Sequence, residues 1–390
     1  MRKTALIIST PRRRLFAAAC AIFLCSALGT GTAAAQAPAI DPAAALRVDS
    51  TARLLAGLPP SSADHAALAD TATWKSHSIA MEKSWSRPRD GQLAAMKQWR
   101  ATELPQQCPV GSTLFYPFSG PDFLNAWTLF PECDTFVMFG LEPVGRLPDP
   151  SAMKPKEFAS LLSDVRDAMI NLFARNYFIT SRMQLQLRTE RLRGVLPVIT
   201  MSMVLAGLEV TGTGPAPFPN TKGAKHNLSG VTIDFRVPGS PRPRRVIYYS
   251  LDISDKGLAD YPAFIDYLRG MAPTTTLVKS ASYLMHITEF RKIRNLVLEI
   301  SEFLVQDDTG VPYAPLRKAG WEVRPYGVYL VPIPPFEAQY QKSLAALYDS
   351  ANPQPLPFRF GYHTKPSDTR STLMVARRPP AAAPPKPDAR

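Results

Sequence analysis

A strand–helix–strand pattern between residues 113 and 141 constrains the fold of this chain more than any other feature. The sequence predicts a strand over residues 113–118, a short helix over 121–130 with proline in its first turn, and a buried strand over 135–141. A helical crossover makes the two strands parallel, with the helix packed on the sheet. We therefore predict an α/β protein whose mixed sheet contains a parallel, Rossmann-like β-α-β unit.

Two cysteines flank this unit, Cys108 before the first predicted strand and Cys133 before the second. Because parallel strands begin at the same edge of a sheet, both thiols should lie at that edge. We predict a disulfide between them, and its closed loop of about 26 residues would stabilise the fold by roughly 3 to 4 kcal/mol on the chain-entropy model. The wide spacing is unlike a C-x-x-C pair, so we predict a structural bond without a redox role.

Residues 1–35 have the pattern of a signal peptide that is removed on export. Basic residues without acidic ones precede an apolar run over residues 15–28. This run is about 14 residues long, whereas a membrane-spanning helix needs roughly 20. Ala33, Ala34 and Ala35 form an A-x-A cleavage site that would leave Gln36 as the new N-terminus. We therefore predict a periplasmic or extracellular protein without a transmembrane anchor after cleavage.

The export route follows from the residues around the apolar run. We favour the general secretory route, while the string RRRLF (residues 12–16) leaves open twin-arginine export of a folded chain. Cys20 and Cys25 leave with the signal peptide, so the mature protein keeps the two cysteines described above. An oxidising compartment favours their disulfide.

Removal of the signal peptide lowers the formal net charge from +13 to +8, because the peptide carries five basic residues. A basic surface can contact anionic envelope polymers or lipids. The basic residues do not cluster with aromatic ones, so we expect no specific nucleic-acid binding. The densest group, Arg242, Arg244 and Arg245, lies among prolines and is typical of a solvated loop.

Composition divides the chain into four segments. They are the signal peptide (1–35), an N-terminal helical segment packed on the body (36–105), an α/β domain (106–376) and a disordered Pro/Ala-rich tail (377–390). In the second segment we predict helices over residues 42–57, 72–86 and 91–103. Three tryptophans anchor these helices to the body: Trp74, Trp85 and Trp99.

The rest of the α/β domain is predicted from periodicity and turn residues. Further helices are predicted over residues 155–177, 262–269 and 289–302, and further strands over 231–237, 245–251, 322–323, 328–331 and 372–376. The apolar run 195–208 fits either a buried helix or a buried strand, and residues 276–286 are also ambiguous. Residues 212–229, rich in Gly, Pro, Asn and Lys, are predicted to form an exposed loop.

Several strings resemble the signature of an uncharacterised family of exported bacterial proteins. They are YPFSGPDF (116–123), FGLEPVG (139–145), KSASYLMH (279–286), QDDTGVP (306–312) and LPFRFGY (356–362). The resemblance covers most of the mature chain as one unit. It implies export and a single fold, and it implies no reaction or ligand.

A first candidate site lies where the two central strands end. Ser119, Gly120 and Asp122 follow the first strand and Glu142 follows the second, at the edge where ligands of parallel sheets bind. A glycine turn at the start of a helix exposes backbone N–H groups that can bind an anion. An acidic residue about 20 positions later could accept hydrogen bonds from ribose hydroxyls. A single glycine stands here in place of the usual three. The alternative is structural: Asp122 caps the helix and Glu142 fixes a turn.

A second candidate site combines His286 with Asp307 or Asp308. If residues 279–286 form a helix, Lys279, Tyr283 and His286 share one face, and His286 could act as a general base with an aspartate as its partner. The alternative is a buried, hydrogen-bonded histidine beside a solvated turn. We predict no metal site, because the remaining mature histidines lie at scattered positions: His65, His77, His226 and His363.

Two hypotheses for function follow. We favour a noncatalytic envelope protein that binds a small or polymeric ligand around Asp122 and Glu142, or that has a structural role. The alternative is a diverged extracytoplasmic enzyme of group transfer or hydrolysis that uses His286. The sequence identifies no cofactor, reaction or specific ligand.

Overall fold

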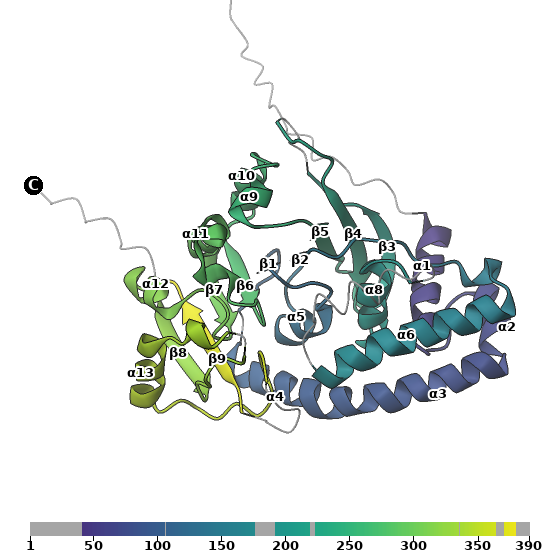
Figure 1. Cartoon of the computed structure of the whole chain (residues 1–390). Helices are drawn as coiled ribbons and strands as arrows, with labels where there is room; N and C mark the ends of the chain where they lie inside the picture. Colours follow the sequence, from purple (N-terminus) through teal and green to yellow (C-terminus); the bar gives the residue numbers. More distant parts are fainter. Residues whose placement is uncertain are drawn as a thin grey trace, which may run out of the picture. The chain divides into compact units, whose positions relative to one another are not determined.

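One mixed sheet of nine strands organises the part of the chain that the computed structural model describes, residues 41–105, 107–175, 192–218, 223–334, 336–363 and 370–379 (Figure 1). These residues belong to a single compact unit, Ile40–Arg390. The predicted signal peptide and residues 380–390 of the predicted tail lie outside the described residues. The strands are β1 (Thr113–Tyr116), β2 (Thr135–Gly140), β3 (Glu209–Pro215), β4 (Ser229–Arg236), β5 (Arg244–Ser250), β6 (Thr274–Val278), β7 (Ser301–Gln306), β8 (Glu322–Gly327) and β9 (Thr372–Arg377).

The centre of the sheet is parallel. β1 pairs in parallel with β2 on one side and with β6 on the other, and the arrangement continues to β5 and β7. Antiparallel β4 and β3 extend the sheet beyond β5, and β9 and β8 extend it beyond β7. Helix α5 (Phe123–Leu129) connects β1 to β2. The predicted mixed sheet and its parallel β-α-β unit are therefore confirmed.

The strand order defines where the sheet opens. Counted along the chain, the parallel strands β1, β2, β5, β6 and β7 lie in the order third, second, first, fourth, fifth. This is the order of the first five strands of a Rossmann fold. The chain first moves from β1 toward β5 and then returns to the other side of β1 with β6. Loops after β1 and β6 therefore leave in opposite directions, which opens a crevice at their carboxyl ends.

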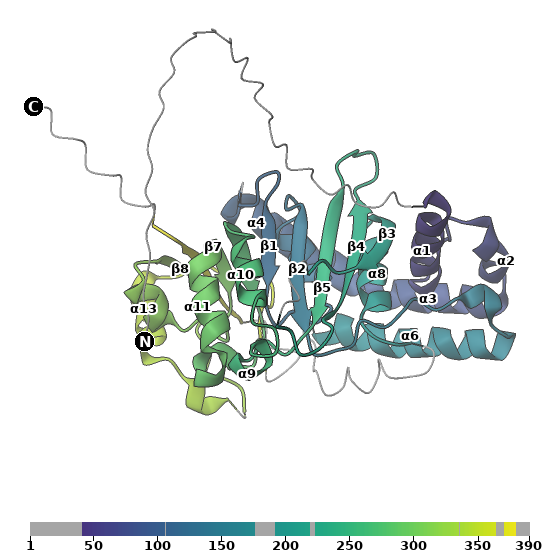
Figure 2. The same ribbon diagram turned by 90° about the horizontal axis from the view of Figure 1, so that it is seen from above.

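Helices cover both faces of the sheet (Figures 1 and 2). Successive side chains of a strand point to opposite faces, so Leu114 and Phe136 enter one core while Phe115 and Val137 enter another. The first core is covered by α1 (Pro42–Leu55), α2 (Ala66–Ala69), α3 (Ala72–Arg87), α4 (Ala94–Glu103), α5, α6 (Pro155–Arg175) and α8 (Leu196–Leu205). The second is covered by α9 (Asp255–Leu258), α10 (Phe264–Arg269), α11 (Arg291–Ile300) and α12 (Tyr313–Lys318). A smaller cluster joins α13 (Lys342–Ala351) to β9.

The N-terminal helices form as predicted. Asp41 caps α1 by accepting the N–H of Ala43, and proline occupies the first helical position. Trp74, Trp85 and Trp99 are all buried, so their role as anchors is confirmed. The Trp99 ring packs edge-on against Tyr326 of β8, with ring centroids 5.1 Å apart. This contact fixes the helical segment to the far end of the sheet.

The apolar run 195–208 forms helix α8, followed by the start of β3. Every residue from Leu196 to Val204 is buried. A helix that is covered on all sides has no polar face, and therefore no periodicity distinguishes it from a buried strand. This explains why the sequence left both possibilities open.

Several predicted boundaries are wrong. Residues 212–215 belong to β3 and pair with β4, so the exposed loop begins later than predicted. The predicted helix over 289–302 ends at Ile300, because Ser301 enters β7, a strand buried on both faces. Residues 328–331, predicted as a strand, form none. The strand predicted at residues 322–323 is β8, which extends to Gly327. β9 continues to Arg377, one residue into the predicted tail.

The predicted disulfide between Cys108 and Cys133 is present, with the two Cα atoms 5.0 Å apart. Both cysteines are buried. One lies before β1 and the other before β2, at the amino edge of the parallel strands. The bond therefore fastens the β-α-β unit at the edge opposite to the crevice.

Candidate functional site

A cavity of about 420 Å³ lies at the carboxyl ends of the parallel strands. Its wall comes from the segments that follow β1, β2, β5 and β6, within residues 116–122, 139–142, 251–253 and 279–284. The volume is within the range of small-molecule sites, which is about 300 to 1,000 Å³. The cavity thus occupies the crevice that the strand order opens, and all four residues predicted for the first candidate site line it.

Ser119 and Gly120 fasten the loop after β1 to the end of β2. The Ser119 hydroxyl accepts the N–H of Phe139 (2.9 Å) and donates to the carbonyl oxygen of Phe139 (3.1 Å), which also accepts the N–H of Gly120 (2.8 Å). Ser119 is buried. Its hydroxyl therefore holds the backbone in place, and the loop is rigidly attached to β2.

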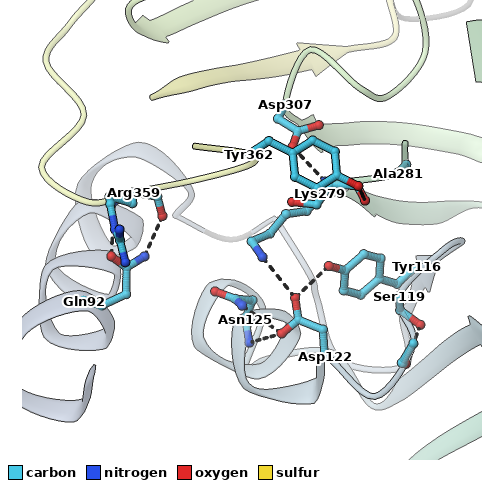
Figure 3. Close-up of polar contacts among 12 residues, drawn as sticks. Gln92, Tyr116, Ser119, Asp122, Asn125, Lys279, Ala281, Asp307, Arg359 and Tyr362 are labelled. Carbon is cyan, nitrogen blue, oxygen red and sulfur yellow. Dashed lines mark hydrogen bonds and ion pairs between the residues drawn. The ribbon is translucent and has the colours of Figure 1, made fainter. Parts of the chain in front are cut away.

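Asp122 is the centre of a buried polar network (Figure 3). Its Oδ1 accepts the backbone N–H of Asn125 (3.4 Å) and the Asn125 side-chain amide (2.7 Å), so Asp122 caps α5. Its Oδ2 accepts the Tyr116 hydroxyl (2.9 Å) and lies 3.4 Å from the Lys279 ammonium. The predicted capping role of Asp122 is confirmed.

The ion pair between Asp122 and Lys279 spans the opening of the sheet. Asp122 follows β1, and Lys279 follows β6 on the other side of the crevice. Both side chains are almost completely buried, with 4% and 1% exposed respectively. A buried charge is stable only if it is paired, so each of these residues depends on the other. Lys279 is thus the partner of Asp122, whereas its spacing in the sequence had suggested a group with Tyr283 and His286.

Glu142 also lines the cavity, just after β2. Its side chain is buried, and burial raises the pKa of its carboxyl group, although hydrogen bonds from nearby backbone N–H groups and from Tyr248 oppose this shift. The carboxylate folds back over Gly140, where a Cβ atom would clash with it and with the Tyr248 hydroxyl. It also lies 3.8 Å from the position that a Cβ of Gly120 would occupy. Glycine at residue 140 therefore leaves the space for Glu142.

The segment 279–283, ambiguous from the sequence, does not form the helix that the second candidate site required. Ser280, Ser282 and Tyr283 have φ angles of 52°, 51° and 54°, in the left-handed region that a right-handed helix excludes. The physical reason lies in the neighbouring loop, where the Asp307 carboxylate accepts the N–H of Ser280 (2.7 Å) and Thr309 Oγ1 accepts the N–H of Ala281 (2.7 Å). These hydrogen bonds take the place of the backbone hydrogen bonds that a helix would form.

Tyr362 completes the support of this segment. Its hydroxyl donates to the Ser280 carbonyl oxygen (2.7 Å) and lies 2.9 Å from the Ser282 hydroxyl (Figure 3). Gln92 in turn accepts the N–H of Arg359 (3.1 Å) and donates to its carbonyl oxygen (2.6 Å). The N-terminal helical segment therefore positions the stretch of chain that contains Arg359 and Tyr362. Tyr362 ends the string LPFRFGY, and no local pattern in the sequence indicated its role.

Unusual backbone conformations are concentrated at the cavity. Among the described residues, five that are not glycine have positive φ angles: Phe118, Ser280, Ser282, Tyr283 and Asn352. Three of them, Phe118, Ser280 and Ser282, line the cavity. Such conformations cost about 1 to 3 kcal/mol each and are typical of ligand-binding and catalytic sites.

Asp308 lies in a second cavity of about 380 Å³, which shares the wall residues Ile333 and Tyr362 with the first. The Tyr283 hydroxyl donates to its Oδ2 (2.5 Å). Burial, followed by the charge of the adjacent Asp307, raises the pKa of Asp308 to about 7. The aspartate pair therefore does not form the solvated turn that was the alternative interpretation of this string, since Asp307 is buried and Asp308 is partly buried.

We expect Asp308→Asn to change how stability depends on pH. The native state holds the Asp308 proton between about pH 4 and pH 7, where the unfolded state has lost it, so this residue's contribution to stability falls as the pH rises. Each unit of pKa difference corresponds to about 1.4 kcal/mol. The variant should therefore gain stability relative to the wild type from pH 4 to pH 7, measured by urea unfolding at several pH values. A constant difference between the two proteins would contradict a raised pKa.

His286 lies apart from both cavities, at the end of a short 3₁₀ turn, Leu284–His286. Its ring packs edge-on against Tyr283 with centroids 5.1 Å apart, and it interacts with the backbone of Asp308 and Gly310. Burial lowers the pKa of His286 to about 4. The condition for a common face of Lys279, Tyr283 and His286 is not met, because the segment is not helical. A catalytic role for His286 with Asp307 or Asp308 stays a prediction.

The basic group before β5 is also more ordered than predicted. Arg244 is buried and its guanidinium lies 5.1 Å from the centre of the Trp127 ring. Arg242 forms an ion pair with Asp134, and Arg245 forms one with Asp234. The interpretation as a solvated loop is therefore wrong for Arg244, because a neighbouring aromatic ring provides a cation–π contact.

The geometry defines a candidate ligand cavity at the switch point of a parallel sheet. Comparison of the chain with protein-family models, with curated proteins and with solved structures found no match. Among the described residues, no helix is long and apolar enough to cross a membrane. In the same part of the chain, no group of three or more His, Cys, Asp or Glu side chains could hold a metal ion.

Proposed function

We propose that this protein is exported to the cell envelope and binds a small ligand, without catalysis, in the cavity between Glu142 and the Asp122–Lys279 pair. The single observation that carries the proposal is the position of the cavity: it occupies the switch point of a parallel sheet, where ligands of such sheets bind. The disulfide is compatible with an oxidising compartment.

The marker strings support the same site. Four of the five strings contribute residues to the cavity wall: those at 116–123, 139–145, 279–286 and 356–362. The fifth, QDDTGVP, holds the strained segment 279–283 through Asp307 and Thr309. Segments that are far apart in the sequence thus meet around one cavity. This arrangement is expected if the marker strings serve to build the cavity.

The polar and apolar parts of the wall are arranged as in a binding site. Most of the lining side chains are apolar or aromatic, including Phe118, Phe290 and Phe336, and a few polar groups converge between them. Apolar surface supplies affinity, and a few positioned polar groups fix the orientation of the ligand. The rigid attachment of the loops lowers the entropic cost of binding, because little ordering is needed when the ligand enters.

Native mass spectrometry of the protein purified from its own host tests this proposal. We expect the wild type to carry a small molecule. Gly140→Ala should lose it, since a Cβ at this position displaces the Glu142 carboxylate from the cavity wall. Gly214→Ala is the matched control, because its Cβ would meet no atom within 4 Å. Glu142→Gln, which keeps the shape of the side chain, provides a second test that does not perturb packing.

Two results would contradict the proposal. One is a wild-type protein that carries no small molecule when purified under native conditions. The other is a ligand that remains equally bound in Gly140→Ala and Glu142→Gln, which would mean that it occupies another part of the protein. Loss of the ligand from Gly214→Ala as well would show that the effect is not specific to the cavity.

A further inference from the structure

The charges on the cavity wall restrict the chemistry of its ligand. Among the described residues that line the cavity, three are acidic, Asp122, Glu142 and Asp252, and one is basic, Lys279. The Lys279 ammonium lies 3.4 Å from Asp122, where both are buried, so its charge is already balanced. The remaining charge of the wall is negative. An anionic ligand would be repelled, while an uncharged or cationic one would not.

The position that holds phosphate in Rossmann folds is also occupied. In those folds the pyrophosphate binds at the N-terminus of the helix that follows the first strand. There it accepts hydrogen bonds from the backbone N–H groups of the helix. Here α5 follows β1, but the Asp122 carboxylate already accepts an N–H at this end. A phosphate at this point would have to compete with Asp122 for that N–H. The fold therefore keeps the crevice but not the phosphate site.

Glu142 has the position of the acidic residue that binds ribose in such folds. It lies just after β2 and lines the cavity, and its carboxylate lies beside Gly120 and Gly140, where Tyr248 and backbone N–H groups also donate to it. A carboxylate accepts hydrogen bonds, and two neighbouring hydroxyl groups of a sugar ring are suitable donors. Leu141 and Ile253, which follow β2 and β5, provide apolar surface in the same cavity wall.

We infer that the ligand of this cavity is a nucleoside-type molecule without phosphate, whose ribose hydroxyls bind Glu142, whose base lies against Leu141 and Ile253, and whose other end is uncharged or cationic. This inference rests on the proposed function, since it concerns the same cavity. It differs from the nucleotide site considered from the sequence in one respect: the ligand carries no phosphate, because Asp122 caps α5 and the net charge of the cavity wall is negative.

Isothermal titration calorimetry of the full chain with a charge series tests the inference. The probes are adenosine, adenosine 5′-monophosphate and 5′-amino-5′-deoxyadenosine. We expect the amino compound to bind at least as tightly as adenosine, and the monophosphate to bind at least tenfold more weakly. Equal or tighter binding of the monophosphate would overturn the inference, because the cavity would then accept the anion that its charges should exclude.

The role of Glu142 is tested with 2′,3′-dideoxyadenosine, which lacks both ribose hydroxyls. Wild-type protein should bind it at least tenfold more weakly than adenosine. In Glu142→Ala this preference should disappear, because the acceptor has been removed. A preference that persists in Glu142→Ala would overturn the assignment of the hydroxyls to Glu142, and Gly214→Ala again serves as the control for folding.

The outcomes separate this inference from the proposed function. If native mass spectrometry finds a bound ligand but none of the nucleosides binds, the ligand class is wrong and the cavity remains a binding site. Methyl β-glucopyranoside identifies one such case: binding of this glycoside without binding of adenosine would mean that a sugar, and not a nucleoside, occupies the Glu142 wall. If no ligand is found by either method, both proposals fail.

Discussion

Lys279→Met is expected to lower the free energy of unfolding by about 3 to 5 kcal/mol, because it leaves the Asp122 carboxylate buried without its cation. Methionine keeps most of the volume of the lysine side chain, so the loss reports mainly on charge. The measurement is urea-induced unfolding at neutral pH. The effect should be large because the two residues join β1 to β6 across the opening of the sheet.

A second substitution separates the charge from the packing. Adding Asp122→Asn to Lys279→Met removes the stranded charge and should recover most of the lost stability. Lys256→Met is the matched control, since this lysine is exposed, and it should change stability by less than about 0.5 kcal/mol. A loss of less than about 1 kcal/mol in Lys279→Met would contradict a buried pair that depends on both partners.

Removal of the disulfide should have an effect of similar size. The bond joins cysteines 25 residues apart in sequence, and the chain-entropy model gives about 3 to 4 kcal/mol for a loop of this length. We expect the double variant Cys108→Ala and Cys133→Ala to lose this amount in urea unfolding. The bond lies at the amino edge of the sheet, opposite the cavity, so ligand binding by the folded variant should be unchanged.

Two observations would contradict this account of the disulfide. If reduction of the wild type with a thiol costs less than about 1 kcal/mol, the bond does not restrain the unfolded chain as the model requires. If the folded double variant loses its ligand, the two edges of the β-α-β unit are coupled in a way that the rigid sheet does not explain.

Local patterns predicted the centre of the fold well. The strand–helix–strand pattern, the turn residues between its elements and the pair of cysteines all report on contacts between residues close in sequence. Because parallel strands share an edge, these local features also predicted that Ser119, Gly120, Asp122 and Glu142 lie together. The amphipathic N-terminal helices were equally clear, since one face of each is solvated.

The rest depends on contacts that no local pattern encodes. Lys279 lies 157 residues from Asp122 in sequence, and it meets Asp122 only because β6 returns beside β1. The segment 279–283 has residues that fit a helix, but side chains of a distant loop bind its backbone. Helix α8 is buried from Leu196 to Val204, so it has no polar face from which its periodicity could be read.

The most direct test of the central claim is a crystal structure of the protein purified from its own host with its ligand retained. We predict electron density for a small molecule between Glu142 and the Asp122–Lys279 pair, at the carboxyl ends of β1, β2 and β6. Density for a ligand elsewhere, with this cavity empty, would contradict the assignment of the switch point as the functional site.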